Sequence, residues 1–544
     1  MLQSSPAASL SSIPWRPLAV VAAILVVAVA VRRLAGRRLL TPVRRRLLLG
    51  VPWGTLLTAA SVLALYLFVQ GAYWQGRPLV TPFRTWSYFG PVGMLLGPFT
   101  HAGPGHLTGN LLGTLVYGTV VEYVWGHYPR KRGAATFSSL RTNPFTRILA
   151  VPAAMAAVGL FSGVFALGPV IGFSGVVFAL AGFAVVTRPY LFLGALLANR
   201  VVGLVLRALR SPEPTVGGSV RFVTPAWANI AIQAHAVGLF AGIFLAVGIL
   251  WARSDRPDPA QLFFAVLVFA VSGGLWAVYV PLGGGQFRLF RWLGTVAVFL
   301  LALLVAAATR NSDRRLLPDF EGSWPSVAGF ALIVVLGALC LAAVPANLTT
   351  VGAGDMPEDG VEVRDYVVTY DEQAQNRYFS NIPVVSRYRD PINQSGVIVA
   401  SDDREIWIAS VSKGRLATAG RATVVVGGVG WRDTVAVNRT GWAVAGNEST
   451  YRVDLTYNGT RRTPFMSDPA TVDGTLADRT VTVRPAEGRF ELVVRRGNET
   501  VGTGPVPENM SSARIGGLTF ERNRSRLYAG TNGTRVPIAR ASSR

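Results

Sequence analysis

Residues 171–183 read IGFSGVVFALAGF, and this segment decides how the rest of the chain is interpreted. Its only nucleophilic side chain is Ser174, which stands among glycines and apolar residues. A serine hydroxyl is a weak nucleophile at neutral pH unless a general base lies beside it. The remaining sequence must therefore supply that base, or the serine has no chemical role.

The composition is typical of a membrane protein. Of 544 residues, 51% are hydrophobic and only 15% are charged, which is too apolar for an ordinary soluble protein. The net charge of +23 would suggest nucleic-acid binding if it were spread over the chain. However, the first 346 residues hold 27 Lys and Arg against 7 Asp and Glu, and the rest hold 25 against 22. The basic excess lies in the apolar part, where arginine-rich loops orient helices, so no nucleic-acid partner is expected.

Ten apolar segments approach the roughly 20 residues that a spanning helix needs. The first is followed by seven arginines at 32–46, and a cleaved signal peptide would carry its charge in front, so we interpret it as a retained helix. The least apolar segment has Asn199 and Arg200 in its middle, where a charge must snorkel or face protein. The segments cover approximately 17–31, 47–69, 104–125, 147–166, 171–187, 189–206, 227–251, 260–281, 290–308 and 325–346.

The distribution of basic residues predicts the orientation of these segments. With the N-terminus outside, the inside loops hold 18 of the 27 basic residues of this region, in agreement with the positive-inside rule. The inside stretches are 32–46, 127–147, Arg188, 252–259 and 309–324. The same count places the C-terminal part outside.

The chain from residue 347 onward changes character and predicts an all-β domain. Alternating segments such as 397–400, 422–426 and 451–455 stand between Gly, Asn and Asp turns, which is typical of a sandwich or two small ones. Nine of its eleven asparagines are in Asn-X-Ser/Thr triplets, which favours glycosylation on the outer side of the membrane. The candidates are Asn347, Asn393, Asn438, Asn447, Asn458, Asn498, Asn509, Asn523 and Asn532. Together with the excess of arginine over lysine, they favour an archaeal cell surface.

One of only four histidines is placed to act as the base for Ser174. His235 lies in segment 227–251, which runs from outside to inside like the segment of Ser174. It follows the start of its segment by about eight residues, about 12 Å at 1.5 Å per residue, so the two side chains would meet if the helices pack closely.

Small residues on both segments favour such close packing. They lie at helical spacing, as in membrane helices whose backbones touch, and would let hydroxyl and imidazole come within about 2.6–3.2 Å. Either motif alone is also compatible with a packing helix that tolerates a serine or a histidine. A histidine inside a membrane, however, favours function. The two ridges are Gly175, Ala179 and Gly182, and Ala234, Gly238 and Gly242.

A third motif lies in residues 98–110, which read PFTHAGPGHLTGN. His106 and Asn110 are four residues apart at the outer end of a helix, so they project from one face. An imidazole, a carboxamide and the backbone N–H of Ser174 would together stabilise an oxyanion. The rival use of His101 and His106 is a metal site, but no third and fourth ligand is evident and the single cysteine, Cys340, offers none.

The motif at 98–110, the motif around Ser174 and the motif around His235 follow one another along the chain on three different helices. Together they resemble the rhomboid family of intramembrane serine proteases. The resemblance covers about residues 47–251 and implies a six-helix core without a cofactor. It implies a dyad in which Ser174 is the nucleophile and His235 the base and then the acid. His106, Asn110 and the Ser174 N–H would form the oxyanion hole, with Gly172 and Gly175 around the serine.

The resemblance also implies supporting roles and shows two departures. His101 would have a more structural role, and Glu122 would be a structural hydrogen-bonding group at the inner end of its helix. Many members have Trp-Arg in the first outer loop, where this chain has Arg84 and Trp86 separately. Many have a tyrosine beside the catalytic histidine where this chain has Phe178, which could stack on His235 but not hydrogen-bond to it.

The expected fold is a mainly α, polytopic membrane bundle, comprising a rhomboid core and about four extra helices, followed by an all-β extracytoplasmic domain. The expected domains are 1–46, 47–251, 252–346 and 347–544. The expected activity is cleavage of transmembrane proteins near the outer face, with segment 189–206 and the outer loop as the gate. The alternatives are an inactive, client-binding protein of the same fold, and a transporter or receptor with an outer ligand-binding β-domain. The β-domain itself would recruit substrates, bind a partner or act as a glycosylated shield.

Overall fold

The computed structural model describes residues 22, 26, 41–128, 137–210, 231–253, 257–283, 286–309, 324–375, 393–531 and 533–542. The chain divides into two compact units, a helical one comprising Met1–Val280 with Arg288–Asn347, and one comprising Leu348–Arg544 with Pro281–Phe287. The predicted helix at 17–31 lies outside the described residues, apart from two isolated positions.

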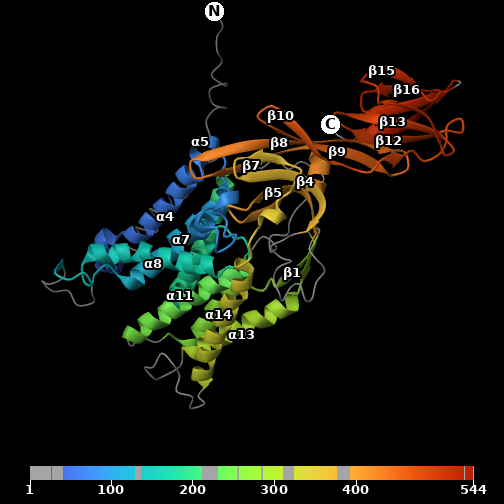
Figure 1. Ribbon diagram of the computed structural model, residues 1–544. Coiled ribbons are helices and arrows are strands. Elements are labelled where there is room, and N and C mark those ends of the chain that lie inside the picture. Colours follow the sequence, from blue (N-terminus) through green and yellow to red (C-terminus); the bar gives the residue numbers. More distant parts are fainter. Residues whose placement is uncertain are drawn as a thin grey trace, which may run out of the picture. The chain divides into compact units, whose positions relative to one another are not determined.

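Nine of the ten predicted apolar segments form helices in the helical unit. Figure 1 labels α4, α7, α8, α11, α13 and α14 among them. Four short elements, α5, η4, α6 and η5, separate the first of these helices from the second. The elements of this unit are α3 (Thr41–Arg46), η2 (Leu48–Gly50), α4 (Trp53–Ala64), η3 (Leu65–Val69), α5 (Ala72–Gln75), η4 (Thr81–Phe83), α6 (Pro91–Leu96), η5 (Gly97–Phe99), α7 (Pro104–Trp125), α8 (Pro144–Val164), α9 (Ser174–Thr187), α10 (Pro189–Arg210), α11 (Ile232–Arg253), α12 (Pro259–Ser272), α13 (Arg291–Ala308) and α14 (Trp324–Asn347). A hairpin of β1 (Tyr279–Gly283) and β2 (Gln286–Leu289) follows α12.

Two predicted segments have different ends in the structure. Helix α9 begins at Ser174 and not at 171, because Gly172 has φ +129, a conformation that side-chain-bearing residues rarely adopt. Helix α12 ends at Ser272, because Gly273 and Gly274 form a turn that the apolar run had hidden. At 14 residues, or about 21 Å, α12 is shorter than the apolar run 260–281 from which it was predicted, and α9 has the same length.

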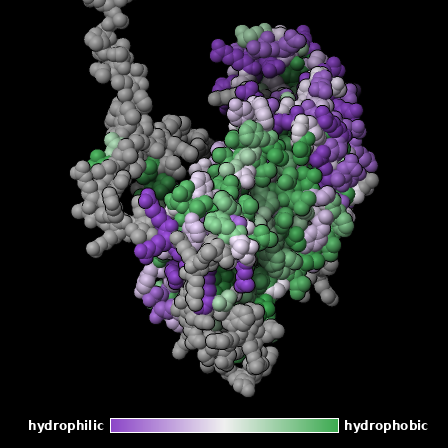
Figure 2. Space-filling view, turned by 90° about the vertical axis from the view of Figure 1, so that its left-hand side faces the viewer, coloured by the Kyte–Doolittle hydropathy of each residue, from purple (hydrophilic) through white to green (hydrophobic). Residues whose placement is uncertain are grey.

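Four of the described helices are long and apolar enough to cross a membrane, namely α8, α11, α13 and α14. Helix α7 has 22 residues, but polar side chains including His106, Asn110 and Glu122 lower its hydropathy. Intramembrane polar groups of this kind mark functional positions by default. Figure 2 shows a broad hydrophobic area over the face of the helices that it presents.

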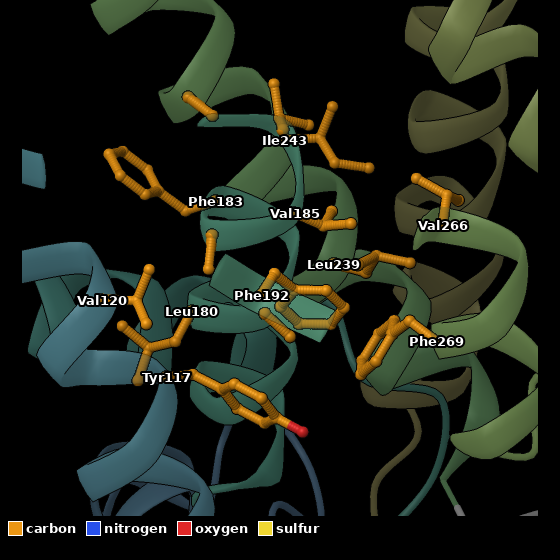
Figure 3. Packing of buried hydrophobic residues seen from close by; sticks show 14 of the residues in the cluster. Tyr117, Val120, Leu180, Phe183, Val185, Phe192, Leu239, Ile243, Val266 and Phe269 are labelled. Carbon is orange, nitrogen blue, oxygen red and sulfur yellow. The ribbon is translucent and has the colours of Figure 1, made fainter. Parts of the chain in front are cut away.

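Helix α9 lies at the centre of the helical unit. From Gly175 to Thr187 nearly all its residues are buried, and it packs against α7, α8, α10, α11 and α12. A helix that is apolar all round is expected to be buried on all sides, as this one is. Leu180, Phe183 and Val185 of α9 contribute to the hydrophobic core that Figure 3 shows. The segment that carries Ser174 thus forms the core of the bundle.

The second unit is built from antiparallel sheets, as its alternating sequence predicts. The first sheet has the order β3-β4-β5-β6, the second β10-β9-β8-β18-β17-β16-β15 with β7 paired to β8, and the third β11-β12-β13-β14. The strands are β3 (Val361–Val363), β4 (Tyr366–Gln375), β5 (Asn393–Ser401), β6 (Ile406–Ser412), β7 (Arg421–Gly428), β8 (Trp431–Val444), β9 (Ser449–Tyr457), β10 (Thr460–Met466), β11 (Ala470–Thr471), β12 (Thr480–Ala486), β13 (Arg489–Arg496), β14 (Glu499–Pro505), β15 (Ser511–Ile515), β16 (Leu518–Asn523), β17 (Arg526–Thr531) and β18 (Thr534–Ala541), with one helix, α17 (Lys413–Ala419).

Part of the second sheet and the third sheet share one hydrophobic core. Val483 and Leu492 of the third sheet pack in the same cluster as Phe520, Leu527 and Ala529 of the second. All five side chains are fully or almost fully buried. This arrangement accounts for the alternation of apolar and polar residues along these strands.

The candidate glycosylation sites differ in their accessibility. Six are exposed in the second unit, and Asn532 and the side chain of Asn393 lie outside what the structure describes. By contrast, Asn347 is buried at the end of α14, where its Nδ2 donates to the carbonyl oxygens of Val164 (3.1 Å) and Ala166 (2.9 Å). Because a glycan would be attached to this same nitrogen, the expectation for Asn347 is corrected: the folded chain does not present it. The exposed asparagines are Asn438, Asn447, Asn458, Asn498, Asn509 and Asn523.

Candidate active site

Ser174 is the first residue of α9. Phe173 before it is buried and Gly172 turns the chain, its N–H donating to the carbonyl of Gly97 at 2.9 Å. The first four N–H groups of a helix have no acceptor within the helix and carry the positive end of its dipole. The sequence thus places the hydroxyl and the backbone N–H of Ser174 together at a helix terminus suited to negative charge.

His235 lies beside Ser174, as predicted. Its Nε2 is 2.7 Å from Ser174 Oγ, within hydrogen-bonding distance. Its ring stacks on Phe178 with a centroid distance of 4.2 Å and an interplanar angle of 15°. Nδ1 of His235 is buried, and the described residues offer it no hydrogen-bonding partner. Ser174 and His235 therefore have the geometry of a catalytic dyad. The aromatic ring of Phe178 supports the imidazole, and no carboxylate among the described residues does so.

The predicted glycine ridges bring the two helices together. A Cβ added to Gly238 would lie 2.1 Å from the carbonyl oxygen of Gly175, and one added to Gly242 would lie 1.9 Å from that of Ala179. Real Cβ atoms essentially never make contacts under 3.0 Å, so a side chain at either position would force the helices apart. On its other side, Gly175 leaves room for Ser162 of α8. The glycines thus allow the backbone contact that sets the distance between Ser174 and His235.

The third motif also reaches the serine turn. His106 and Asn110 of α7 lie against Gly172, where an added Cβ would be 2.4 Å from His106 Cε1 and 3.5 Å from Asn110 Nδ2. Asn110 Nδ2 is 2.9 Å from His101 Nε2, so the amide donates one of its hydrogens to this ring. The other hydrogen of the amide remains for a further acceptor. His101 is fully buried and thus orients Asn110, in keeping with the structural role expected for it.

The comparison with protein families agrees with this geometry. Residues 90–252 match the family model of the Rhomboid domain. The chain therefore contains a Rhomboid domain. No curated protein and no solved structure matches it in the corresponding comparisons. Together with its apolar helices, the domain identifies a multi-pass membrane protein.

The segment between η3 and α7 is packed without an adjacent Trp-Arg pair. Arg84 Nη1 donates to the carbonyl of Pro169 at 3.3 Å, and Trp86 Nε1 donates to that of Thr81 at 2.7 Å. Between them, Thr85 N–H donates to the carbonyl of Val170, whose own N–H donates to Thr85 Oγ1. The loop is thereby joined to the segment that precedes Ser174, which replaces the packing that the sequence had left in doubt.

Near the C-terminal end of α7, Glu122 forms a buried hydrogen-bonding centre. It accepts from the N–H groups of Gly54 and Thr55, each at 2.8 Å, and from Thr55 Oγ1 at 2.7 Å. His127 Nδ1 accepts from the N–H of Leu48, so the proton on this ring is at Nε2, which donates to Glu122 at 2.6 Å. A carboxylate at the N-terminus of α4 stabilises that helix, so Glu122 has the structural role that the resemblance implied.

Two glutamines near the site were not singled out from the sequence. Gln70 is buried and holds the backbone of His101, accepting from its N–H at 2.8 Å and donating to its carbonyl at 2.9 Å. Gln233, two residues before His235, donates to the carbonyls of Phe165 (2.6 Å) and Leu339 (2.7 Å). The available signal was a polar amide at the end of an apolar run for Gln70, and within an apolar helix for Gln233. Among the described residues, no group of three or more His, Cys, Asp or Glu is arranged to hold a metal ion.

Proposed function

We propose that this rhomboid protein is an intramembrane serine endopeptidase that cleaves transmembrane helices of other membrane proteins near the outer face. The observation that carries the proposal is the 2.7 Å separation between Ser174 Oγ and His235 Nε2. A base at this distance can accept the hydroxyl proton as the oxygen attacks a carbonyl carbon. An inactive client-binding protein would not need this contact.

The chemistry follows in two steps. Ser174 Oγ attacks the scissile carbonyl while its proton moves to His235 Nε2, and the same proton then passes to the nitrogen of the leaving amine. A water molecule next attacks the acyl-enzyme, loses a proton to His235 Nε2 and releases the new carboxylate, and Ser174 Oγ regains the proton. No cofactor enters either step.

The positive charge that His235 carries between these transfers must be stabilised inside the protein. Phe178 lies parallel to the imidazole at 4.2 Å, and a cation over an aromatic face within about 6 Å is attracted by the ring. We therefore assign Phe178 the supporting role that a carboxylate has in catalytic triads.

The negative charge of the tetrahedral intermediate would lie at the start of α9. The Ser174 N–H, the second amide hydrogen of Asn110 and the imidazole of His106 are donors around this point. Removal of one such donor typically lowers the rate by about 100- to 1,000-fold. The role of His101 would be to hold Asn110 in position through their 2.9 Å hydrogen bond.

A substrate helix would enter sideways and unwind in part before its carbonyl reaches Ser174, since lipid offers no partners for its backbone. We propose α10 with the outer loop as the gate. Arg200 of α10 is exposed, and its Nη2 donates to the carbonyl of Ser272 at 3.3 Å. Hydrogen exchange tests this assignment: protection of α10 equal to that of its neighbours would exclude it. The orientation with the N-terminus and the β-domain outside belongs to the same proposal.

The activity is tested with a fluorophosphonate probe and a reporter membrane protein. The full chain should be labelled and should cleave the reporter, whereas Ser174→Ala and His235→Ala should do neither. Labelling that survives both substitutions would exclude the dyad. A folded wild-type chain that neither labels nor cleaves would favour the inactive, client-binding alternative.

A further inference from the structure

Helix α12 lies outside the segment that matches the Rhomboid domain, yet it contacts the support of the candidate catalytic histidine. The match ends at residue 252 and α12 begins at Pro259. Phe269 of α12 packs against Phe178 with ring centroids 5.2 Å apart and an interplanar angle of 60°. Phe178 in turn is the ring on which His235 stacks.

Gly273, directly after the end of α12, lies against the same ring. Gly273 leaves the space that Phe178 fills, because a Cβ added there would be 3.3 Å from both Cε1 and Cζ of Phe178. At that distance the neighbouring ring would have to move by a few tenths of an ångström. The position of Phe178 is thus limited by the ring of Phe269 and by the backbone of Gly273, which has no side chain.

Phe269 is itself held firmly. It is 5% exposed, and it packs against Phe192 of α10 with centroids 5.5 Å apart and planes at 78°. Phe192 is fully buried and stacks on Tyr117 of α7 at 5.5 Å. Figure 3 shows Phe192 between Tyr117 and Phe269. The aromatic contacts therefore continue from His235 through Phe178, Phe269 and Phe192 to α7.

We propose that Phe269 is a positioning residue for His235, which makes the appended helix α12 part of the catalytic unit. Phe269 does not touch the reacting atoms. It restricts the ring of Phe178, and Phe178 restricts the plane of the imidazole that must face Ser174 Oγ. The effect of Phe269 on catalysis rests on the proposed function. The effect of Phe269 on the orientation of the His235 imidazole does not depend on that function.

The test compares three variants of the full chain. Phe269→Leu keeps an apolar side chain of similar size but removes the ring, Phe269→Tyr restores a ring, and Phe264→Leu makes the same change in α12 at a side chain that is 61% exposed. Aromatic pairs are worth about 0.5–1.5 kcal/mol, so the maximal rate of fluorophosphonate labelling should fall about three- to tenfold in Phe269→Leu. The concentration for half-maximal labelling should change little, and Phe269→Tyr and Phe264→Leu should label like the wild type.

A second measurement reads the ring itself and does not depend on activity. The chain has only four histidines, so the imidazole signals of His235 can be assigned by NMR from a His235→Ala spectrum. Stacking on Phe178 should shift these signals upfield, and Phe269→Leu should reduce the shift. If the wild type does not label, the proposed activity fails and the NMR result alone decides the positioning role. Unchanged His235 signals in a folded Phe269→Leu would overturn it, as would labelling at the wild-type rate.

If Phe269→Leu does not fold, Gly273→Ala perturbs the same ring from the backbone side. It should displace the His235 signals while leaving most of the packing of α12 in place. A folded Gly273→Ala with wild-type signals would equally overturn the inference.

Discussion

The sharpest prediction concerns Gly238, because a single added methyl group there should separate the dyad. A Cβ added to Gly238 would lie 2.1 Å from the carbonyl oxygen of Gly175, the residue that follows Ser174. Ordinary contact begins at 3.4 Å, so the backbones must separate by about 1.3 Å. The 2.7 Å between Ser174 Oγ and His235 Nε2 would then become about 4 Å, beyond hydrogen-bonding distance.

The expected loss follows from the role of the base. General-base catalysis contributes about 100- to 10,000-fold, and a displacement of 1 Å can remove about 100-fold. Gly238→Ala should therefore lower the rate constant of fluorophosphonate labelling by about 100-fold or more. Overpacking of this kind also costs about 1–3 kcal/mol of stability, so the unfolding temperature must be measured alongside.

Two further glycines of α11 separate the local effect from general destabilisation. Gly248 has nothing within 4 Å of its added Cβ, so Gly248→Ala should match the wild type in both measurements. Gly242→Ala meets Ala179 at 1.9 Å but lies seven residues, about 10 Å, beyond His235. It should lower the stability as much as Gly238→Ala while reducing the labelling less. Wild-type labelling by Gly238→Ala would refute the reasoning, and equal losses at both positions would mean that the loss is not local.

Three other substitutions test separate parts of the molecule. Asn110→Ala should lower the rate constant of labelling by about 100- to 1,000-fold. His101→Ala should have a smaller effect, which should disappear in the Asn110→Ala background. Additive effects of the two substitutions would show that His101 acts independently of Asn110. Glu122→Ala should cost about 3 kcal/mol in the free energy of unfolding, because four donors lose their acceptor, whereas a change under 1 kcal/mol would contradict the role given to this carboxylate. Mass spectrometry should find no glycan on Asn347, because its side chain is buried. A glycopeptide that contains a modified Asn347 from folded protein would contradict the buried position of this side chain.

The dyad was predictable because its determinants are local in sequence. Gly175, Ala179 and Gly182, and Ala234, Gly238 and Gly242, have the spacing of helix faces, which favoured a close contact between α9 and α11. His101 and Asn110 are only nine residues apart, on either side of the start of α7, and they form a hydrogen bond with each other. The alternation in the tail likewise predicted its antiparallel strands. The sandwich and the domain boundaries remain predictions.

The structure differs from the predictions where hydrophobicity does not report geometry. The run 260–281 is apolar throughout, but Gly273 and Gly274 turn the chain, and hydropathy assigns no cost to a turn. Asn347 has the triplet of a surface acceptor, yet its environment is made by Val164 and Ala166, more than 180 residues away. Neither position could be placed before the packing of α12 and α14 was known.

The contacts of α12 and α14 with the rhomboid domain share one location. Phe269 of α12 packs on Phe178, and the carbonyl of Leu339 in α14 accepts from Gln233, two residues before His235. Asn347, at the end of α14, donates to the carbonyls of Val164, the last residue of α8, and of Ala166, in the segment that leads to Ser174. In lipid, losing such partners leaves polar groups that nothing else can satisfy. Helices α12 and α14 therefore contact residues beside Ser174 and His235, although the match to the Rhomboid domain ends at residue 252.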